Sequence, residues 1–90
     1  MDKKILTVYK SVTGFTREYA EMIAREVGSA LMDIKEANAK NMSGFDVIVF
    51  GGRMHAGRVD GLKRAKELYG QSGSSQLIVF ATGATPNEAR

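Results

Sequence analysis

The chain has 90 residues and no cysteine, with 43% hydrophobic and 26% charged residues. These values are typical of one small globular domain, and they exclude a disordered chain, a disulfide scaffold and any site built on thiolates. No apolar run approaches the roughly 20 residues that cross a bilayer, and the N-terminus lacks the features of a signal peptide. We therefore expect a single cytoplasmic domain over residues 1–90 and no transmembrane segment.

The charge of the chain is mildly basic. Thirteen Lys and Arg residues against ten Asp and Glu residues give a formal net charge of +3. The basic residues do not form one block interleaved with aromatic residues, which argues against nucleic acid as a partner. The single histidine, His55, has no acidic or histidine neighbours at metal-ligand spacing, so we expect no metal site.

The stretch that organises the sequence lies near the N-terminus. Residues 5–9 form a β-branched and aromatic run, which predicts a buried strand. Residues 20, 23, 24 and 27 are apolar at helical spacing and Gly28 follows them, which predicts an amphipathic helix. The turn between the two is Ser11-Val12-Thr13-Gly14-Phe15-Thr16. Such a turn brings hydroxyls, backbone N–H groups and the positive end of the helix dipole together, an arrangement that binds phosphate.

The spacing Ser-x-Thr-Gly-x-Thr directly after a first strand resembles the FMN-phosphate loop of the flavodoxin family. The match covers all four fixed positions, Ser11, Thr13, Gly14 and Thr16. A purely structural interpretation stays open, in which Thr16 caps the helix and Gly14 makes the turn. The resemblance implies a flavodoxin-like fold with FMN as its cofactor.

Residues 30–61 predict two further strands. Residues 30–34 form a short strand, and the polar stretch 35–44 is expected to be mostly irregular, with a turn at Ser43-Gly44. Residues 46–52 contain four consecutive apolar residues between turn signals, which predicts a central parallel strand covered on both faces. Residues 53–61 are expected to form a glycine-rich connection.

The remaining sequence predicts one helix and one strand. The helix has Leu62, Ala65, Leu68 and Tyr69 on its inner face and ends at Gly70, and residues 71–75 are expected to form a loop. Residues 76–81 predict another buried strand. With right-handed crossovers, these elements form an open parallel α/β sheet of flavodoxin type in the strand order 2-1-3-4.

The C-terminal residues Thr85-Pro86-Asn87-Glu88 predict the start of a helix, and the chain ends at Arg90. The flavodoxin resemblance implies a fifth strand, which is missing. We therefore expect a truncated or naturally shortened domain, with a complete four-stranded domain as the alternative. The strand at 77–81 would then lie at a sheet edge with unpaired backbone groups, which favours a homodimer through this strand.

The predicted topology also places the site. Ligands of open α/β sheets bind beyond the carboxyl ends of the strands, where the strand order reverses. Three loops meet there, at residues 11–16, 51–57 and 82–85. By the resemblance, the first loop holds the FMN phosphate through hydroxyls and amides, and the other two flank the isoalloxazine ring. The residues expected to bind the cofactor are Ser11, Val12, Thr13, Gly14, Phe15, Thr16, Gly52, Arg53, Met54, His55, Thr82 and Gly83.

Two residues of the second loop and one directly after it have open roles. His55 is a candidate for stacking on the flavin or for stabilising its reduced anion, and it is also consistent with a solvated side chain. Arg53 and Arg58 either add positive potential near the flavin or are ordinary exposed charges. The run Phe50-Gly51-Gly52-Arg53-Met54-His55-Ala56-Gly57 is similar to flavodoxin-domain oxidoreductases of the protoporphyrinogen-oxidase type.

Other classes of protein lack their defining residues here. A receiver domain needs acidic residues after the first strand and an Asp at the end of the third, where this chain has Tyr9-Lys10 and Gly51-Gly52. Neither the dinucleotide fingerprint nor the P-loop motif occurs. The resemblance implies an FMN-binding redox domain, for electron transfer or as a flavin-dependent oxidoreductase, with a redox partner or small-molecule substrate. The alternative is a non-catalytic fragment of the same fold that folds or dimerises without FMN.

Overall fold

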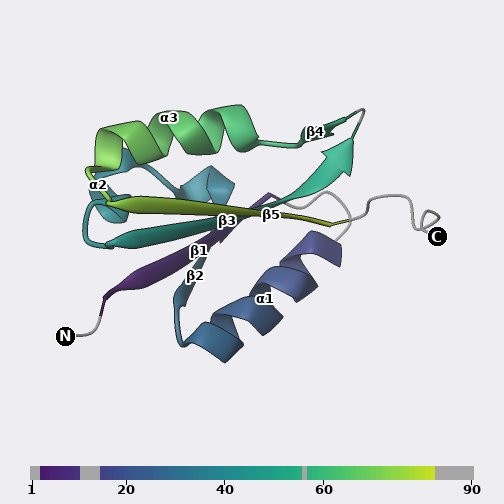
Figure 1. Ribbon diagram of the computed structural model, residues 1–90, viewed down its shortest axis with the longest axis horizontal. Helices are drawn as coiled ribbons and strands as arrows, with labels where there is room; N and C mark the ends of the chain where they lie inside the picture. Colours follow the sequence, from purple (N-terminus) through teal and green to yellow (C-terminus); the bar gives the residue numbers. More distant parts are fainter. Residues whose placement is uncertain (1–2, 11–14, 56, 83–90) are drawn as a thin grey trace.

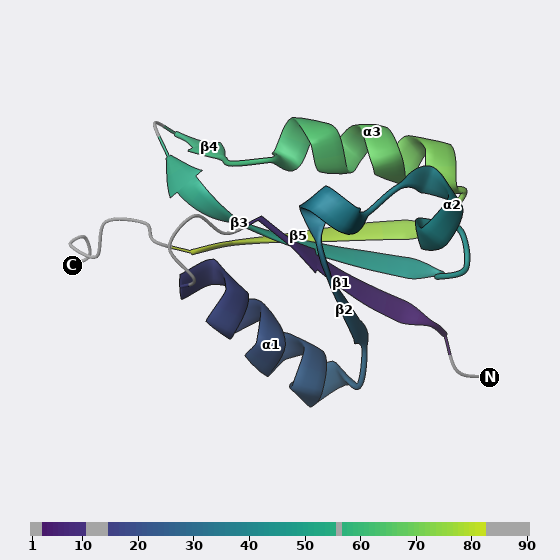
Figure 2. The same ribbon diagram turned by 180° about the vertical axis from the view of Figure 1, so that it is seen from behind.

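The computed structural model describes residues 3–10, 15–55 and 57–82. A sheet lies between two layers of helix (Figure 1). Its parallel strands are β1 (Ile5–Tyr9), β2 (Ala30–Asp33), β3 (Val47–His55) and β5 (Gln76–Thr82). Helix α1 (Phe15–Val27) covers one face. The opposite face carries α3 (Leu62–Ser72), with the short elements η1 (Ile34–Glu36) and α2 (Ala39–Met42) beside it (Figure 2).

The strand order is β2-β1-β3, with β5 paired to the other side of β3. This confirms the predicted order 2-1-3-4, because β5 is the fourth of the predicted strands. The register places Val8 beside Met32 on one side and beside Phe50 on the other, and Phe50 beside Val79. The sheet is therefore open and parallel, as the sequence predicts.

The centre of the sheet is buried on both faces. Val47, Ile48, Val49 and Phe50 are all at most 8% exposed, which confirms the prediction of a central covered strand. Successive side chains of a strand point to opposite faces. Those of Leu6, Val8, Ile48 and Phe50 form the main core with Ala65, Leu68 and Met42 on the α3 side.

Two stretches contain regular structure that we did not predict. Within residues 35–44, which we expected to be mostly irregular, Asn38 and Asn41 form a capping box that starts α2. Reciprocal side-chain bonds of this kind satisfy N–H groups at a helix start. In the predicted connection, β3 continues to His55 and folds back as β4 (Arg58–Val59), antiparallel to it. Gly57, at φ 81°, supplies the left-handed backbone conformation that this tight turn needs.

Helix α3 does not end at Gly70. It continues to Ser72, and Gly73 is its C-cap with a φ of 78°. The hydroxyl of Ser72 donates to the carbonyl oxygen of Tyr69 at 2.8 Å, which satisfies one acceptor of the last turn. Of Gly70 and Gly73, only Gly73 adopts the left-handed backbone conformation, and α3 therefore ends there.

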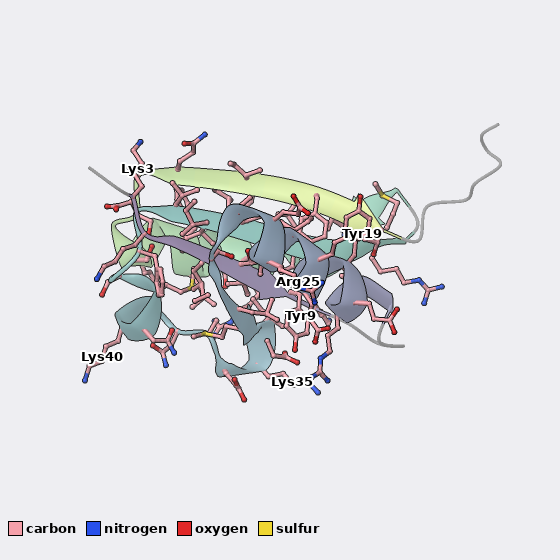
Figure 3. The ribbon with its side chains drawn as sticks, turned by 90° about the horizontal axis from the view of Figure 1, so that it is seen from below. Lys3, Tyr9, Tyr19, Arg25, Lys35 and Lys40 are labelled. Carbon is pink, nitrogen blue, oxygen red and sulfur yellow. The ribbon has the colours of Figure 1, made fainter. Side chains whose placement is uncertain are left out.

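Within the described residues, strand β5 lies at an edge of the sheet, as expected, and is only partly buried there. Ile78 and Val79 are 45% and 40% exposed, although they point to opposite faces of the sheet. Within the described ranges β5 pairs with β3 alone, so it lies at an edge and the flanking helices leave part of both faces uncovered. Figure 3 shows the α1 side, where Tyr19 lies toward β5 and Tyr9 lies on the other side of the helix. The ring of Tyr19 packs on that of Phe80, with 5.5 Å between centroids.

Candidate functional site

The candidate site lies at the carboxyl ends of the parallel strands. The chain passes from β1 to β2 on one side and then to β3 on the other side of β1, so the strand order reverses between β1 and β3. The N–H of Lys10 donates to the carbonyl oxygen of Gly51 at 3.0 Å and holds the two strands together up to this point. Helix α1 begins at Phe15, so its N-terminal end follows closely on the end of β1. This is the crevice in which open α/β sheets bind ligands.

Two predicted site residues meet at this edge. The Oγ1 atoms of Thr16, in the first turn of α1, and Thr82, at the end of β5, lie 2.6 Å apart. The two residues are 3% and 4% exposed. The structure therefore joins one residue of the predicted loop 11–16 to one residue of the predicted loop 82–85 through a buried hydrogen bond.

This pair of hydroxyls retains hydrogen-bonding capacity. Each hydroxyl carries one proton and two acceptor lone pairs, so a bond between them uses only one of the two protons. In the described part of the chain, neither hydroxyl has a second hydrogen-bond partner. The remaining O–H can donate to an oxygen of a bound phosphate at the start of α1, where the helix dipole also favours negative charge. A hydroxyl donor at the start of a helix is compatible with a phosphate group at this edge.

The two glycines at the end of the parallel part of β3 are required by packing. A side chain at Gly51 would run into the ring of Phe80. Gly52, which we expected to bind the cofactor, is buried, and a side chain there would run into the carbonyl group of Asp60 and the side chain of Val59. The hairpin formed by β3 and β4 is a sufficient structural reason for Gly52.

The remaining predicted site residues fall into two groups. Arg53 is exposed and Met54 is half-buried in the hairpin, where it pairs with Val59. Ser11, Val12, Thr13, Gly14 and Gly83 lie outside the described residues, as does the C-terminal stretch predicted to start a helix, and Phe15 and His55 are described by their backbone alone. Their proposed roles stay predictions.

One ion pair at this edge was not predicted from the sequence. The Nζ atom of Lys10 lies 3.1 Å from Oδ1 of Asp60, and the N–H of Asp60 donates to the carbonyl oxygen of Arg53 at 2.8 Å. These bonds fix the segment after β4 against the end of β1. The partners are 50 residues apart in the sequence, and no local pattern relates them.

Tyr9 lies one residue before Lys10 and is 8% exposed. Burial raises the pKa of its phenol above the ordinary value of 10.0, and the negative charge of Asp33 raises this pKa further. Both effects disfavour the phenolate. Tyr9 is therefore a neutral hydrogen-bonding group at physiological pH.

Across residues 3–10, 15–55 and 57–82, no three His, Cys, Asp or Glu side chains are grouped so that they could hold a metal ion. In the same ranges, no helix has both the length and the apolar character needed to cross a membrane.

The fold and the edge geometry define an open α/β protein whose strand order reverses at the carboxyl edge of the sheet. Residues 6–89 match the model of the flavodoxin domain, and the chain belongs to this family. A comparison with curated proteins found no match.

Solved structures share the fold. Flavodoxin 2 from Bacillus cereus has a TM-score of 0.64 and 20% identity, with 87% of this chain and 60% of that chain covered. The WrbA-like flavodoxin from Agrobacterium tumefaciens has a TM-score of 0.68 and 19% identity, with 89% and 59% covered. A protein from Bacteroides eggerthii, provisionally described as a flavoprotein, has a TM-score of 0.73 and 20% identity, with 93% and 73% covered. The chain thus spans about three-fifths of the length of the first two of these proteins.

Proposed function

We propose that this chain is an FMN-binding redox domain, acting in electron transfer or as a flavin-dependent oxidoreductase. The observation that carries the proposal is the buried Thr16–Thr82 hydroxyl pair at the N-terminal end of α1, which makes no second hydrogen bond within the described residues and can donate to a phosphate oxygen. Membership of the flavodoxin domain family supports the same cofactor. A cytoplasmic location is part of the proposal and rests on the cysteine-free composition.

Each predicted loop has a role in this proposal. The hydroxyls of Ser11, Thr13 and Thr16 and the amides near Gly14 and Phe15 hold the phosphate, as the match to the family's loop implies. Thr82 positions Thr16 through their hydrogen bond. The other proposed contacts of the flavin are Val12, Gly52, Arg53, Met54, His55 and Gly83. Bound FMN supplies the electron-transfer chemistry, and the protein sets its orientation and potential.

The direct test is a visible absorption spectrum of the purified chain, followed by titration with FMN under flavin-fluorescence detection. We expect quenching that saturates near one FMN per chain. Thr16→Val should weaken binding, because it removes a phosphate donor, whereas Thr7→Val removes a hydroxyl bonded to Ser29 at 2.7 Å elsewhere in the fold and should leave FMN affinity unchanged. A folded chain that shows no quenching at FMN concentrations up to about 1 mM would contradict the proposal.

A second candidate is a non-catalytic domain that assembles with a copy of itself through β5. The observation that favours it is the exposure of Ile78 and Val79 on a strand that pairs on one side only within the described residues. Exposed edges of this kind pair readily with another strand. Light scattering should then give a dimer, and Ile78→Lys should give a monomer. Leu31→Lys is the matched control, because Leu31 is 37% exposed on β2, the opposite edge of the sheet. A monomeric parent chain at micromolar concentration would overturn this candidate.

A further inference from the structure

The last part of β3 leaves the parallel sheet. Residues 47–53 pair with β5, whereas the two residues that follow pair with β4. Figure 1 shows the end of β3 turning toward the side of the sheet that carries α3, with β4 beside it. The β3–β4 hairpin (residues 53–60) therefore lies at the carboxyl edge, next to the crevice in which open α/β sheets bind ligands.

One charged side chain ties the hairpin to β1. Within the hairpin, backbone pairs join β3 to β4, and the N–H of Asp60 donates to the carbonyl oxygen of Arg53 at 2.8 Å. The link to β1 is the ion pair of 3.1 Å between Lys10 and Asp60. Among the side chains that the structure describes in residues 54–60, no other forms a hydrogen bond or ion pair with another element. The place of the hairpin at the edge therefore depends on Lys10.

The side chain of Lys10 crosses the turn between β4 and α3. A Cβ atom at Gly61 would lie 2.9 Å from Cδ of Lys10, so the stem of Lys10 lies against the backbone of Gly61. Its ammonium group meets Asp60, the residue before Gly61. Lys10 thus contacts two consecutive residues of the turn, one by packing and one by charge.

The backbone of Lys10 is fixed as well. Its N–H donates to the carbonyl oxygen of Gly51 at 3.0 Å. Lys10 follows β1 directly and precedes the loop 11–16, which is expected to hold the phosphate. The backbone of this one residue belongs to the phosphate side of the crevice, and its side chain reaches the hairpin on the other side.

The Lys10–Asp60 pair contributes little to the stability of the whole fold. The two side chains are 40% and 36% exposed, and water and salt screen charges at such positions. The Arg64–Glu67 pair offers a contrast, because it joins residues three apart within α3. Lys10 and Asp60 are 50 residues apart and join two separate segments. The pair therefore acts on the geometry of the edge.

We propose that Lys10 is a positioning residue of the flavin site: through Asp60 it holds the β3–β4 hairpin against the flavin ring, and it does not itself bind the phosphate. This inference rests on the proposed function, because it requires a flavin at the carboxyl edge. Thr16 and the loop 11–16 act on the phosphate half of the cofactor, and Lys10 acts on the ring half. Loss of the ion pair should weaken binding of the ring and leave the contribution of the phosphate unchanged.

FMN and riboflavin are the probes, because they share the ring and differ by the phosphate. Each is titrated into the parent chain and into Lys10→Met, which removes the ammonium group and keeps an unbranched stem. We expect both affinities to fall about three- to fivefold, so that their ratio stays the same. Lys10→Arg should keep both parent affinities.

Further variants test whether the pair acts as a unit. Asp60→Asn should lower riboflavin affinity by about the same factor as Lys10→Met, and the double variant should lose no more than either single variant. Arg64→Met is the matched control, because it removes one positive charge and breaks the Arg64–Glu67 pair. It should change either affinity by less than about twofold.

The hold on the hairpin is measured separately, in the chain without flavin. Hydrogen exchange of the Asp60 amide reports on its bond to the carbonyl oxygen of Arg53. Lys10→Met should accelerate this exchange about threefold or more, because local opening of the hairpin becomes easier. Lys10→Arg and Arg64→Met should leave it at the parent rate.

Several results would overturn the inference. A loss of FMN affinity with unchanged riboflavin affinity in Lys10→Met would show that Lys10 binds the phosphate directly. Equal losses in Arg64→Met would show an effect of net charge, and unchanged exchange of the Asp60 amide in Lys10→Met would show that Lys10 does not hold the hairpin. A chain that binds neither flavin would instead refute the proposed function, and faster exchange in Lys10→Met would then still assign the position of the hairpin to Lys10.

Discussion

The hydroxyl groups of Thr16 and Thr82 share a buried hydrogen bond of 2.6 Å, although 66 residues separate them in the sequence. One lies in the first turn of α1 and the other ends β5. The bond therefore fixes the start of α1 against the strand at the far edge of the sheet. It links the helix that should receive the phosphate to the loop that should flank the flavin.

Removing one hydroxyl of this pair should destabilise the fold. Thr16→Val or Thr82→Val leaves the partner hydroxyl buried without its bond, and we expect each to lower the free energy of unfolding by about 1–3 kcal/mol. The double variant removes both groups, so its cost should be smaller than the sum of the two. Urea unfolding followed by circular dichroism measures all three. Strictly additive losses would show that the two hydroxyls do not interact.

Gly51 should not tolerate a side chain. Gly51→Ala would run into the ring of Phe80, and overpacking of this kind costs about 1–3 kcal/mol of unfolding free energy. Thermal unfolding should show the loss, and Phe80→Leu in the same chain should recover part of it. Gly44→Ala is the control, because a side chain at Gly44 meets only open space and should change stability by less than about 0.5 kcal/mol. Equal effects of the two alanines would refute the packing argument.

Replacing Gly70 by alanine should stabilise the fold. It lies inside α3, and a side chain there meets no atom within 4 Å. Gly70→Ala should raise the free energy of unfolding by about 0.5–1 kcal/mol, because alanine loses less backbone entropy in a helix. Gly73→Ala, at the left-handed C-cap with a φ of 78°, should instead destabilise the chain. Denaturant midpoints of the two variants should move in opposite directions, and a shift in the same direction would contradict this interpretation of the two glycines.

The free energy of unfolding should fall at alkaline pH because Tyr9 titrates. Its pKa is raised above 10.0 by burial and by the charge of Asp33, so the unfolded chain loses the phenolic proton at a lower pH than the folded chain. The neutral phenol of Tyr9 therefore contributes its full stabilisation at pH values below its pKa in the unfolded chain. This stabilisation is lost as the pH rises through its pKa in the folded chain. Unfolding free energies of the parent chain and of Tyr9→Phe, measured from pH 8 upward, should diverge above about pH 10. Parallel curves would show that Tyr9 titrates alike in both states.

The main strands and their order were predictable from local patterns. The apolar run 47–50 has the composition of a doubly covered strand and is buried, and Gly28 ends α1 with a φ of 71°. These features depend on periodicity and on the conformational freedom of glycine, both of which can be read from sequence. Topology then follows from the handedness of parallel crossovers.

The features that sequence did not predict depend on contacts between distant residues. A glycine such as Gly70 is typical of a helix end. Helix α3 nevertheless continues past it, because Leu68 and Ser72 on either side of Gly70 are buried. The Lys10–Asp60 pair and the Thr16–Thr82 bond join residues at least 50 positions apart. The hairpin of β3 and β4 has only one weak signal, Gly57 two residues after His55. Sequence therefore predicts the location of the candidate site better than the bonds that hold it.

The measurement that tests the central claim most directly is the affinity for FMN compared with that for riboflavin, which lacks the phosphate. If the carboxyl edge holds the cofactor by its phosphate, FMN should bind at least about tenfold more tightly, the effect of charge-assisted hydrogen bonds. Ser11→Ala/Thr13→Ala should remove most of this difference while leaving riboflavin affinity unchanged. Equal affinities for FMN and riboflavin in the parent chain would contradict the proposal that this edge is a phosphate site.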